Sequence, residues 1–456
     1  MAFLDENYLV ENETGKRLYQ QVKDLPIVDA HNHGDVEEIV KNDGWTDIWE
    51  VEAATDHYVW ELMRKRGVPE EKITGKASNK EKWLALARIF PEIAGNPTYE
   101  WIHLDLKRRF GIEQNINEHT AEMIWEKTRV SLGSEEMKPQ RLLKDMNVKI
   151  MCTTDDPTST LEFHQQAASE IEGVSILPTW RPDKAMNIEQ KAWHDFVVDM
   201  GKRYNEDTAV FSGFIKALQK SHDFFNENGC KASDHGIFEP ITYQVKQEDA
   251  ANIHQKAFQG EELTVGEIKD YKAFLLCKFG EMNKETDWVT QLHIGAVRDY
   301  RDSLFEELGP DSGGDLSNQH IEIVNNLNYF MNKFDQELKI VLYSLDPTHW
   351  SNLATLSRAF SNVSLGAAWW YNDSPYGMEE QLKLISTIDL LANFAGMVTD
   401  SRKLISYGSR TEMFRRVMSS TLGKMVEKGQ MPYNVAAELA VGLSYKQQEE
   451  LFFSSN

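Results

Sequence analysis

The sequence predicts an α/β fold, a (β/α)8 TIM barrel with an α-helical insertion domain after the first strand. Eight short apolar runs alternate with segments of helical periodicity, which is typical of parallel sheets buried on both faces. A side chain capable of catalysis or ligand binding follows each run directly. One long segment between the first and second runs lacks strand-like patterns, and it marks the insertion.

The eight predicted strands are mostly β-branched or bulky, as buried parallel strands are. They are LPIVDA at 25–30, VKIMCT at 148–153, VSILP at 174–178, KASDH at 231–235, WVTQLHI at 288–294, LKIVLYSL at 338–345, VSLGAAW at 363–369 and GMVTD at 396–400. KASDH has little β propensity. One predicted helix between them carries apolar residues at helical spacing, namely Leu384, Ile385, Ile388 and Leu391. Another starts at Thr411 and ends at Gly429.

The insertion is expected over residues 35–145, resting on the catalytic face, while residues 1–34 and 146–456 form the barrel with its terminal helices. The spacing of Val59, Leu62 and Met63 is helical. Six of the 12 tryptophans lie in this segment, enough for a core of its own: Trp45, Trp49, Trp60, Trp83, Trp101 and Trp125.

Polar side chains at the ends of the runs support the barrel. They are His31 and His33, Asp155 and Asp156, Trp180 and Arg181, Asp234 and His235, His293, Asp346 and His349, Trp369 and Trp370, and Asp400 and Arg402. In a TIM barrel the carboxyl ends of all eight strands share one face, where active sites lie. Loops are polar in any protein, but this explains a reactive side chain after one or two strands more easily than after all eight.

Composition excludes several classes of protein. No apolar stretch reaches 18 residues, so no membrane span is expected, and the acidic N-terminus lacks the features of a signal peptide. Cys152, Cys230 and Cys277 show no CxxC spacing and fit reduced thiols in a cytoplasmic protein. A net charge of −23 argues against nucleic acid or an anionic membrane as partner. An anionic ligand would need local arginines.

The first strand ends in a candidate metal site. His31 and His33 are two residues apart, so on an extended segment both imidazoles point to one side, where they can bind a metal or simply be solvated. Asp400 follows the last strand, which neighbours the first in a closed barrel, and is the expected third ligand. His293 can face the metal or the substrate. Asp234, not lysine, stands at the fourth strand, so one divalent ion is expected, zinc first and manganese second.

Further residues indicate acid–base chemistry and an anionic substrate. His57 and Tyr58 stand where a helix of the insertion starts, as acid–base groups or as a cap followed by packing residues. Arg181 and Arg402 carry planar forks suited to a carboxylate, although one arginine alone usually forms a surface ion pair. The aromatic run that starts at Trp369 is expected to pack in the protein core and at its rim, and stacking on a sugar is the alternative role. The stretch GPDSGGD, 309–315, lacks the ending of a P-loop.

Long motifs over nearly the whole chain resemble the uronate (glucuronate) isomerase family of the amidohydrolase superfamily. They include DLPIVDAHNH, TDHYVWELMRKRGV, NPTYEWIHLDLKRRFGI, TTDDP, PTWRPD, ASDH, QLHIGAVRDYRDSLFEELGPDSGGD, WWYNDSPYGME and VTDSRKLISYGSRTEMFRR. The resemblance implies a metal-dependent barrel that interconverts D-glucuronate with D-fructuronate, and D-galacturonate with D-tagaturonate, in hexuronate catabolism. Proton transfer through a cis-enediol is the expected route, and the sequence leaves hydride transfer open.

The resemblance also implies residue roles. The metal ligands fall on His31, His33 and Asp400, with catalytic roles for Tyr58, His57, Asp400 and Asp234 and substrate-binding roles for Arg181, Arg402 and His293. Trp369, from the aromatic run, is added as a candidate substrate-binding residue. A small hexuronate is the expected partner, and a homo-oligomer the expected assembly. Two alternatives remain: a mononuclear metal-dependent hydrolase and a non-catalytic sugar-acid binding protein. The acid–base residue Tyr58 and the two arginines argue against the hydrolase, which does not require them. The metal ligands and acid–base groups argue against the binding protein, because binding alone needs neither.

Overall fold

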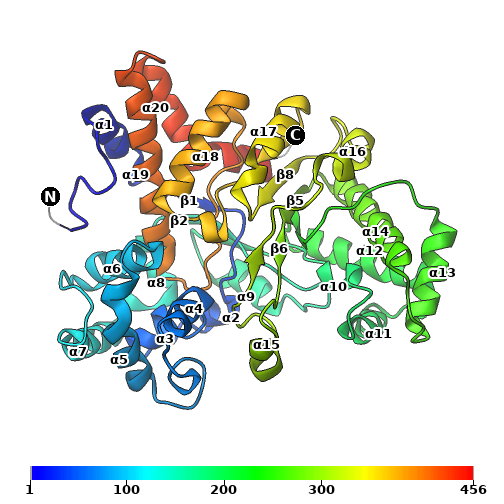
Figure 1. Cartoon of the computed structure of the whole chain (residues 1–456), viewed down its shortest axis with the longest axis horizontal. Helices are drawn as coiled ribbons and strands as arrows, with labels where there is room; N and C mark the ends of the chain where they lie inside the picture. Colours follow the sequence, from blue (N-terminus) through cyan, green and yellow to red (C-terminus); the bar gives the residue numbers. More distant parts are fainter. Residues whose placement is uncertain (1–2, 455–456) are drawn as a thin grey trace.

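The computed structural model describes residues 3–454 and has an α/β architecture built on parallel strands (Figure 1). Seven strands line up with predicted runs: β1 Ile27–Asp29, β2 Val148–Cys152, β3 Ser175–Leu177, β4 Ala232–Ile237, β5 Val289–Ile294, β8 Ile340–Ser344 and β9 Val363–Leu365. All their pairings are parallel, in the orders β1-β2-β3 and β4-β5-β8-β9. KASDH therefore forms a strand despite its low propensity, because its residues are paired with β5 and buried.

Two junctions join these sheets into the predicted barrel. Trp180 forms parallel bridges with Asp155 and Ser233, which link the ends of β2, β3 and β4. On the other side, Ala395 N–H donates to Leu365 O of β9 at 2.9 Å. The same segment reaches the first strand, where Asp400 N–H donates to His31 O and His33 N–H donates to Ser401 O, at 3.2 and 3.0 Å.

The prediction of an eighth strand at 396–400 is wrong in its secondary structure, although the segment occupies the eighth position. Gly396 and Asp400 have φ of +100° and +48°, which breaks an extended ladder. The backbone N–H of Thr399 donates to the Asp29 carboxylate at 3.0 Å instead of to a neighbouring strand. A short hairpin that the sequence did not predict, β6 Ala296–Val297 with β7 Leu316–Ser317, follows β5.

Residues 36–145 contain only helices and loops. The helices are α2 Val36–Lys41, α3 Ile48–Glu52, α4 His57–Lys65, α5 Asn79–Ile89, α6 Pro97–Phe110, α7 Ala121–Leu132 and α8 Pro139–Asp145, with short 3-10 turns at Glu70–Lys72, Phe90–Ile93 and Glu135–Met137. Their ends follow the local sequence: Asn96 caps α6, Pro97 occupies its first position, and Gly111 ends it in the left-handed conformation. Their apolar cluster also takes in Ile27 and Val148, so these helices pack directly on the barrel.

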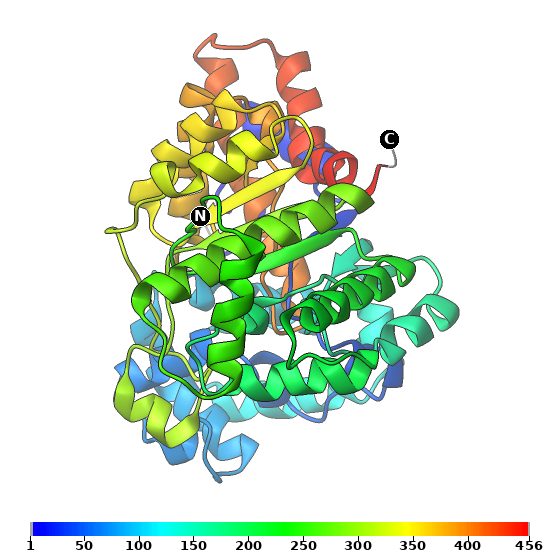
Figure 2. The same ribbon diagram turned by 90° about the vertical axis from the view of Figure 1, so that its right-hand side faces the viewer.

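The remaining helices surround the strands (Figures 1 and 2). They are α1 Glu13–Val22, α9 Glu162–Glu170, α10 Asp183–Met186, α11 Ala192–Tyr204, α12 Phe211–Glu227, α13 Gln247–Phe258, α14 Val265–Thr286, α15 Asp302–Leu308, α16 Val324–Lys333, α17 Trp350–Ala359, α18 Pro375–Ile388, α19 Ser406–Glu427, α20 Tyr433–Val441 and α21 Gln447–Phe453, with shorter turns at Pro347–His349, Trp370–Asn372, Leu391–Asn393 and Gly442–Lys446. No helix within residues 3–454 is long and apolar enough to cross a membrane.

Two predicted helix boundaries need correction. The helix expected to start at Thr411 starts at Ser406, because buried polar residues such as Ser409 and Arg410 interrupt the apolar pattern there. The helix through Leu384 ends at Ile388, so the expected continuation to Leu391 is wrong.

Candidate metal centre and substrate site

The candidate site is assembled where the first and last segments of the barrel meet. Asp29, at the end of β1, is 1% exposed and accepts hydrogen bonds from Thr399 N–H at 3.0 Å and Thr399 Oγ1–H at 2.6 Å. Burial raises the pKa of Asp29 to about 6, against the effect of these hydrogen bonds. This contact fixes Asp400 opposite His31 and His33.

Three ligand atoms converge at this junction. Asp400 Oδ1 lies 3.2 Å from His31 Nε2 and 3.2 Å from His33 Nε2, and the three groups satisfy the geometry of a metal-binding set. Ligand atoms about 2 Å from a shared ion lie about 3 Å from one another. Burial alone would raise the pKa of Asp400, but the two histidines hold it well below its usual range, so the carboxylate is ionised.

The hydrogen bonds of His33 leave its Nε2 lone pair available. Thr154 Oγ1–H donates to Asn32 O at 2.6 Å, and the same oxygen lies 3.0 Å from His33 Nδ1. Because a hydroxyl has one proton, Thr154 must accept from Nδ1–H, and Nε2 is then unprotonated. Burial lowers the pKa of His33 to about 3, which keeps the ring neutral. A metal ligand requires this tautomer.

A second set of possible ligands shares His31. Its Nδ1 lies 3.4 Å from Asp234 Oδ2, without the alignment of a hydrogen bond, and His293 Nδ1 donates to Asp234 Oδ1 at 2.6 Å. His31, Asp234 and His293 also satisfy metal-binding geometry, and His293 Nε2 has no hydrogen-bond partner among the described residues. The structure therefore offers two possible sets of metal ligands: the predicted set of His31, His33 and Asp400, and a second set of His31, Asp234 and His293.

Two aromatic side chains contact the second oxygen of Asp400. Trp369 Nε1–H donates to Oδ2 at 3.1 Å, and Tyr58 O–H donates to it at 3.4 Å. Burial raises the pKa of Tyr58 well above its usual value, so the phenol is protonated at neutral pH. The Asp56 carboxylate accepts the backbone N–H of Tyr58 at 2.9 Å, which starts α4 and places the phenol in the site.

His57, the neighbour of Tyr58, faces the same cavity. Its ring stacks on Trp370, with centroids 5.6 Å apart, and its buried Nδ1 has no hydrogen-bond partner among the described residues. Burial, with Arg402 nearby, lowers the pKa of His57. A neutral imidazole with a free nitrogen can accept or return a proton.

The arginines of the cavity differ in what they contact. Arg181 donates from Nε to Asp183 at 2.8 Å and from Nη1 to Asp234 at 3.1 Å. The guanidinium of Arg402 has no hydrogen bond or ion pair within residues 3–454, and it lines the cavity. Arg298, which the sequence analysis missed, also lines it, with its guanidinium 4.4 Å from the centroid of the Trp370 ring.

The space above the ligand cluster is narrow. The cavity lined by His31 and His33 encloses about 10 Å³, and a neighbouring cavity of about 470 Å³ shares His33 and Arg402 with it. Arg402 therefore stands in the wall that the two cavities share.

Other predicted site residues lie elsewhere. His235 accepts or donates a hydrogen bond with Ser233 at 2.7 Å and is fully buried away from the cavity. Asp346 caps the turn that starts at Pro347. Asp155 bonds Thr153 Oγ1 and lines the larger neighbouring cavity, not the ligand cluster. Polarity at a strand end therefore did not separate site residues from caps and core residues.

The loop GPDSGGD supports the cavity wall from outside. Gly314 N–H donates to Glu61 of α4 at 2.9 Å, and Arg64 of α4 donates to Ser312 O. Asp315 accepts from Arg298 Nη1 at 3.4 Å. In both overall views α15 lies at the same end of the molecule as α4, which agrees with these contacts (Figures 1 and 2).

The parallel barrel and the histidine–aspartate cluster at the carboxyl ends of its strands define the class of amidohydrolase-like TIM barrels. The family model of glucuronate isomerase matches residues 1–452. The uronate isomerase of Thermotoga maritima is 61% identical over 451 residues, covering 99% of this chain and 100% of its own length. The chain therefore belongs to the glucuronate isomerase family.

Solved structures agree with this assignment. The crystal structure of uronate isomerase from Thermotoga maritima superimposes with a TM-score of 0.98, at 61% identity, and covers 99% of this chain and 100% of that chain. The crystal structure of glucuronate isomerase from Caulobacter crescentus gives a TM-score of 0.96 at 24% identity, covering 100% of this chain and 98% of that chain. The second likeness concerns the fold alone.

Proposed function

We propose that this protein is a uronate isomerase that interconverts D-glucuronate with D-fructuronate, and D-galacturonate with D-tagaturonate, in hexuronate catabolism. One observation carries the proposal: an ionised carboxylate, Asp400, contacts His31 and His33 through one oxygen and a protonated Tyr58 through the other. Arg402, without a partner among the described residues, stands beside them. Membership in the glucuronate isomerase family supports the substrate class.

One divalent ion, zinc or manganese, would be held by His31, His33 and Asp400. The residues fit such an ion because Thr154 fixes the metal-binding tautomer of His33 and because Asp400 stays ionised. A bound divalent ion supplies charge stabilisation to substrate oxygens. Metal content of one equivalent per chain is expected, and its loss in His33→Ala with retention in His293→Ala would favour this set over the one with Asp234 and His293.

Proton transfer through a cis-enediol fits the protonation states of the site. The reaction moves a hydrogen between C2 and C1, and it needs a base near carbon and a relay between the two oxygens. Asp400 and neutral His57 are the bases that face the cavity, and Tyr58 is the acid. We assign the oxygen relay to Tyr58 with Asp400, with Asp234 holding Arg181 and His293 in place.

The uronate carboxylate is assigned to Arg402, with Arg298 beside it. Arg181 is a weaker candidate than the sequence suggested, because Asp183 and Asp234 already occupy its fork. His293 and Trp369 line the same cavity and are assigned to the sugar hydroxyls. An anion entering a protein with a net charge of −23 needs this local attraction.

The test is incubation of the protein with D-glucuronate in D2O, with and without added zinc or manganese, followed by NMR. The ketose should form only with metal, and solvent deuterium should enter its C1 position. Ketose formed without any solvent deuterium would favour hydride transfer. No ketose from either D-glucuronate or D-galacturonate in the metal-loaded protein would refute the function.

We further propose a cytoplasmic homo-oligomer, without nucleic-acid or membrane partners, divided into a barrel of residues 1–34 and 146–456 and a helical insertion of 35–145. The three cysteines are free and buried, and the net charge of −23 disfavours polyanions. The insertion supplies Tyr58 and His57 to the site, which supports its role as a cover of the catalytic face. Light scattering would give the number of subunits.

A further inference from the structure

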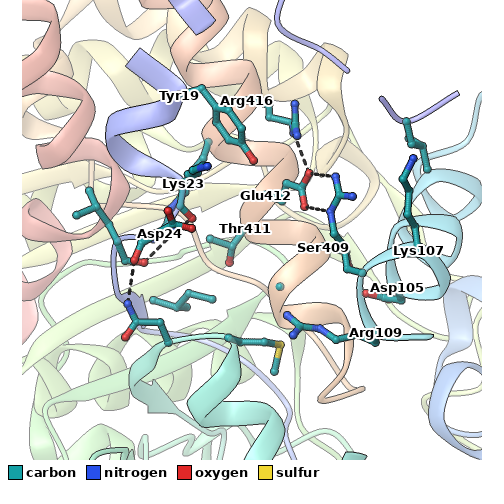
Figure 3. A pocket seen from close by; sticks show the side chains of 18 of the residues that line it. Tyr19, Lys23, Asp24, Asp105, Lys107, Arg109, Ser409, Thr411, Glu412 and Arg416 are labelled. Carbon is teal, nitrogen blue, oxygen red and sulfur yellow. Dashed lines mark hydrogen bonds and ion pairs between the residues drawn. The ribbon is translucent and has the colours of Figure 1, made fainter. Parts of the chain in front are cut away.

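A second cavity, of about 660 Å³, lies apart from the candidate metal centre (Figure 3). Ile27, the first residue of β1, and Asn147, which precedes β2, lie in its wall. His31 and His33 follow β1 at its other end, so the two sites lie at opposite ends of the strands. Helices α1, α6 and α19 supply much of the remaining wall.

Arg109, at the end of α6, presents an unpaired guanidinium to this cavity. It has no hydrogen bond or ion pair within residues 3–454, and burial lowers its pKa. The backbone of α19 comes close to it at Gly408, where an added Cβ would lie 2.7 Å from Arg109 Nη2. A half-buried arginine without a partner is unusual, because desolvation of the charge is not offset.

The carboxyl groups that act most strongly on the charge of Arg109 are those of Asp105, Asp145 and Glu412, and none of them forms an ion pair with it. Asp145 lies 3.0 Å from Arg141 Nε and is committed to that ion pair. Asp105 is 1% exposed, and burial, with Glu52 nearby, raises its pKa well above the usual value. The Asp105 carboxyl therefore gives up its negative charge more readily than an exposed aspartate would.

Glu412 is also committed, as the dashed lines of Figure 3 show. It accepts from Arg108 at 2.9 and 2.7 Å and from Arg416 at 2.9 Å. The two arginines more than balance its single charge. The lining as a whole has six basic and six acidic side chains, so what distinguishes Arg109 is that no carboxylate of the wall forms an ion pair with it.

Two buried donors in the same wall also lack partners. Thr411, on the face of α19 that lines the cavity, is 6% exposed, and its Oγ1 has no hydrogen-bond partner among the described residues (Figure 3). Arg415, 3% exposed, donates from its Nη atoms to the carbonyls of Lys23, Leu25 and Pro26, while its buried Nε is unpartnered. Unsatisfied donors together with an uncompensated charge call for an acceptor that carries negative charge.

We propose that this cavity binds an oxyanion group, the phosphate or carboxylate of a small metabolite, through the Arg109 guanidinium and the Thr411 hydroxyl. The planar fork of arginine matches two oxygens of such a group, and the threonine hydroxyl supplies a further donor. Lys23, also in the wall, adds positive charge, whereas Lys107 is paired with Glu113 at 3.6 Å. The volume is large enough for an anion attached to a sugar-sized body.

The test uses the metal-loaded full chain with three probes: inorganic phosphate, glucose 6-phosphate and D-glucose. Calorimetry of the wild type should show saturable binding of at least one anion and none of D-glucose. Arg109→Met should weaken anion binding at least tenfold, and Thr411→Val should weaken it less. Equal affinity for both anions would identify a site for free phosphate, whereas a preference for the sugar phosphate would identify a site for a phosphorylated metabolite.

Two further variants keep the result interpretable. Arg129→Met removes an exposed charge that is not part of the cavity wall and should leave anion affinity unchanged. Without anion, Arg109→Met should melt no lower than the wild type, because it removes an uncompensated charge. Equal anion affinity in the wild type and Arg109→Met would overturn the proposal. So would binding that Arg402→Met abolishes and Arg109→Met leaves intact, because the anion would then occupy the metal site.

Discussion

At the scale of single residues, Arg181 and Arg402 illustrate how equal side chains can have unequal roles. Arg181 follows β3 and Arg402 follows the segment in the eighth barrel position, and both line the same cavity. Arg181 is held by two aspartates, so its charge is already balanced, whereas Arg402 has no partner among the described residues. The free guanidinium is therefore the one that can attract and orient a substrate carboxylate.

Arg402→Lys should be impaired although it keeps the charge, because lysine lacks the fork that matches a carboxylate. Charge-assisted hydrogen bonds are worth roughly 1.5–3 kcal/mol each, so kcat/KM for D-glucuronate should fall about tenfold or more. Kinetics with D-glucuronate and D-glucose in both proteins provide the measurement. Equal proportional losses on the two sugars would show that Arg402 does not hold the carboxylate.

Thr154 sets the tautomer of His33, so at the proposed metal site its hydroxyl would support metal binding without touching the ion. Thr154→Val removes the acceptor of the His33 Nδ1–H and should weaken metal affinity about 10- to 100-fold. Competition with a chelator measures the change. Thr355→Val, an exposed threonine of α17, serves as the control and should bind metal as the wild type does. Unchanged affinity in Thr154→Val would mean that His33 is not a ligand.

At the scale of elements, α4 depends on a buried ion cluster that joins the insertion to the last barrel segment. Lys403 Nζ lies 2.9 Å from Glu52 of α3 and 3.4 Å from Asp56, the cap of α4. All three residues are buried. Because α4 carries His57 and Tyr58 while Lys403 follows Arg402, this cluster aligns the two halves of the site.

Lys403→Met should both destabilise the protein and reduce kcat. Removing one partner of a buried ion cluster typically costs about 3–5 kcal/mol, because the remaining carboxylates lose their compensation. Calorimetric melting and kinetics measure the two effects. Lys41→Met, which removes an exposed lysine paired with Glu37, should change neither. Full activity in Lys403→Met would show that the ion cluster does not position α4.

At the scale of the whole molecule, we expect buried histidines outside the candidate metal centre to contribute to acid stability. Burial lowers the pKa of His103, His222 and His254 to about 4. The unfolded value is near 6.5, so their contribution is complete above pH 6.5 and is lost as the pH falls through 4. Each contributes roughly 3 kcal/mol at most.

His254→Gln tests this dependence. Nε2–H of His254 donates to Thr208 O at 2.9 Å, and Nδ1 lies 3.2 Å from the Tyr271 hydroxyl, so a glutamine amide can replace both contacts. The melting temperature of the variant should fall less steeply than that of the wild type between pH 6.5 and pH 4. His119→Gln, at an exposed position, should follow the wild type. Parallel curves for all three proteins would contradict the assignment.

The sequence by itself determined the order of strands, the helical character of residues 36–145 and the pair His31 and His33. These features depend on local patterns: apolar runs, helical spacing and the two-residue period of an extended chain. The family resemblance rests on the same linear motifs.

Only the tertiary structure decided which charges are free. Arg181 is paired with Asp234 across two strands, Arg298 reaches the cavity by stacking on Trp370, and Arg109 is left without a partner. The eighth strand is likewise replaced by a segment held through the Asp29 carboxylate. The physical reason is common to all of these cases: the groups that could satisfy a charge or a hydrogen bond come from residues far away in the sequence, so folding alone determines whether one of them reaches it.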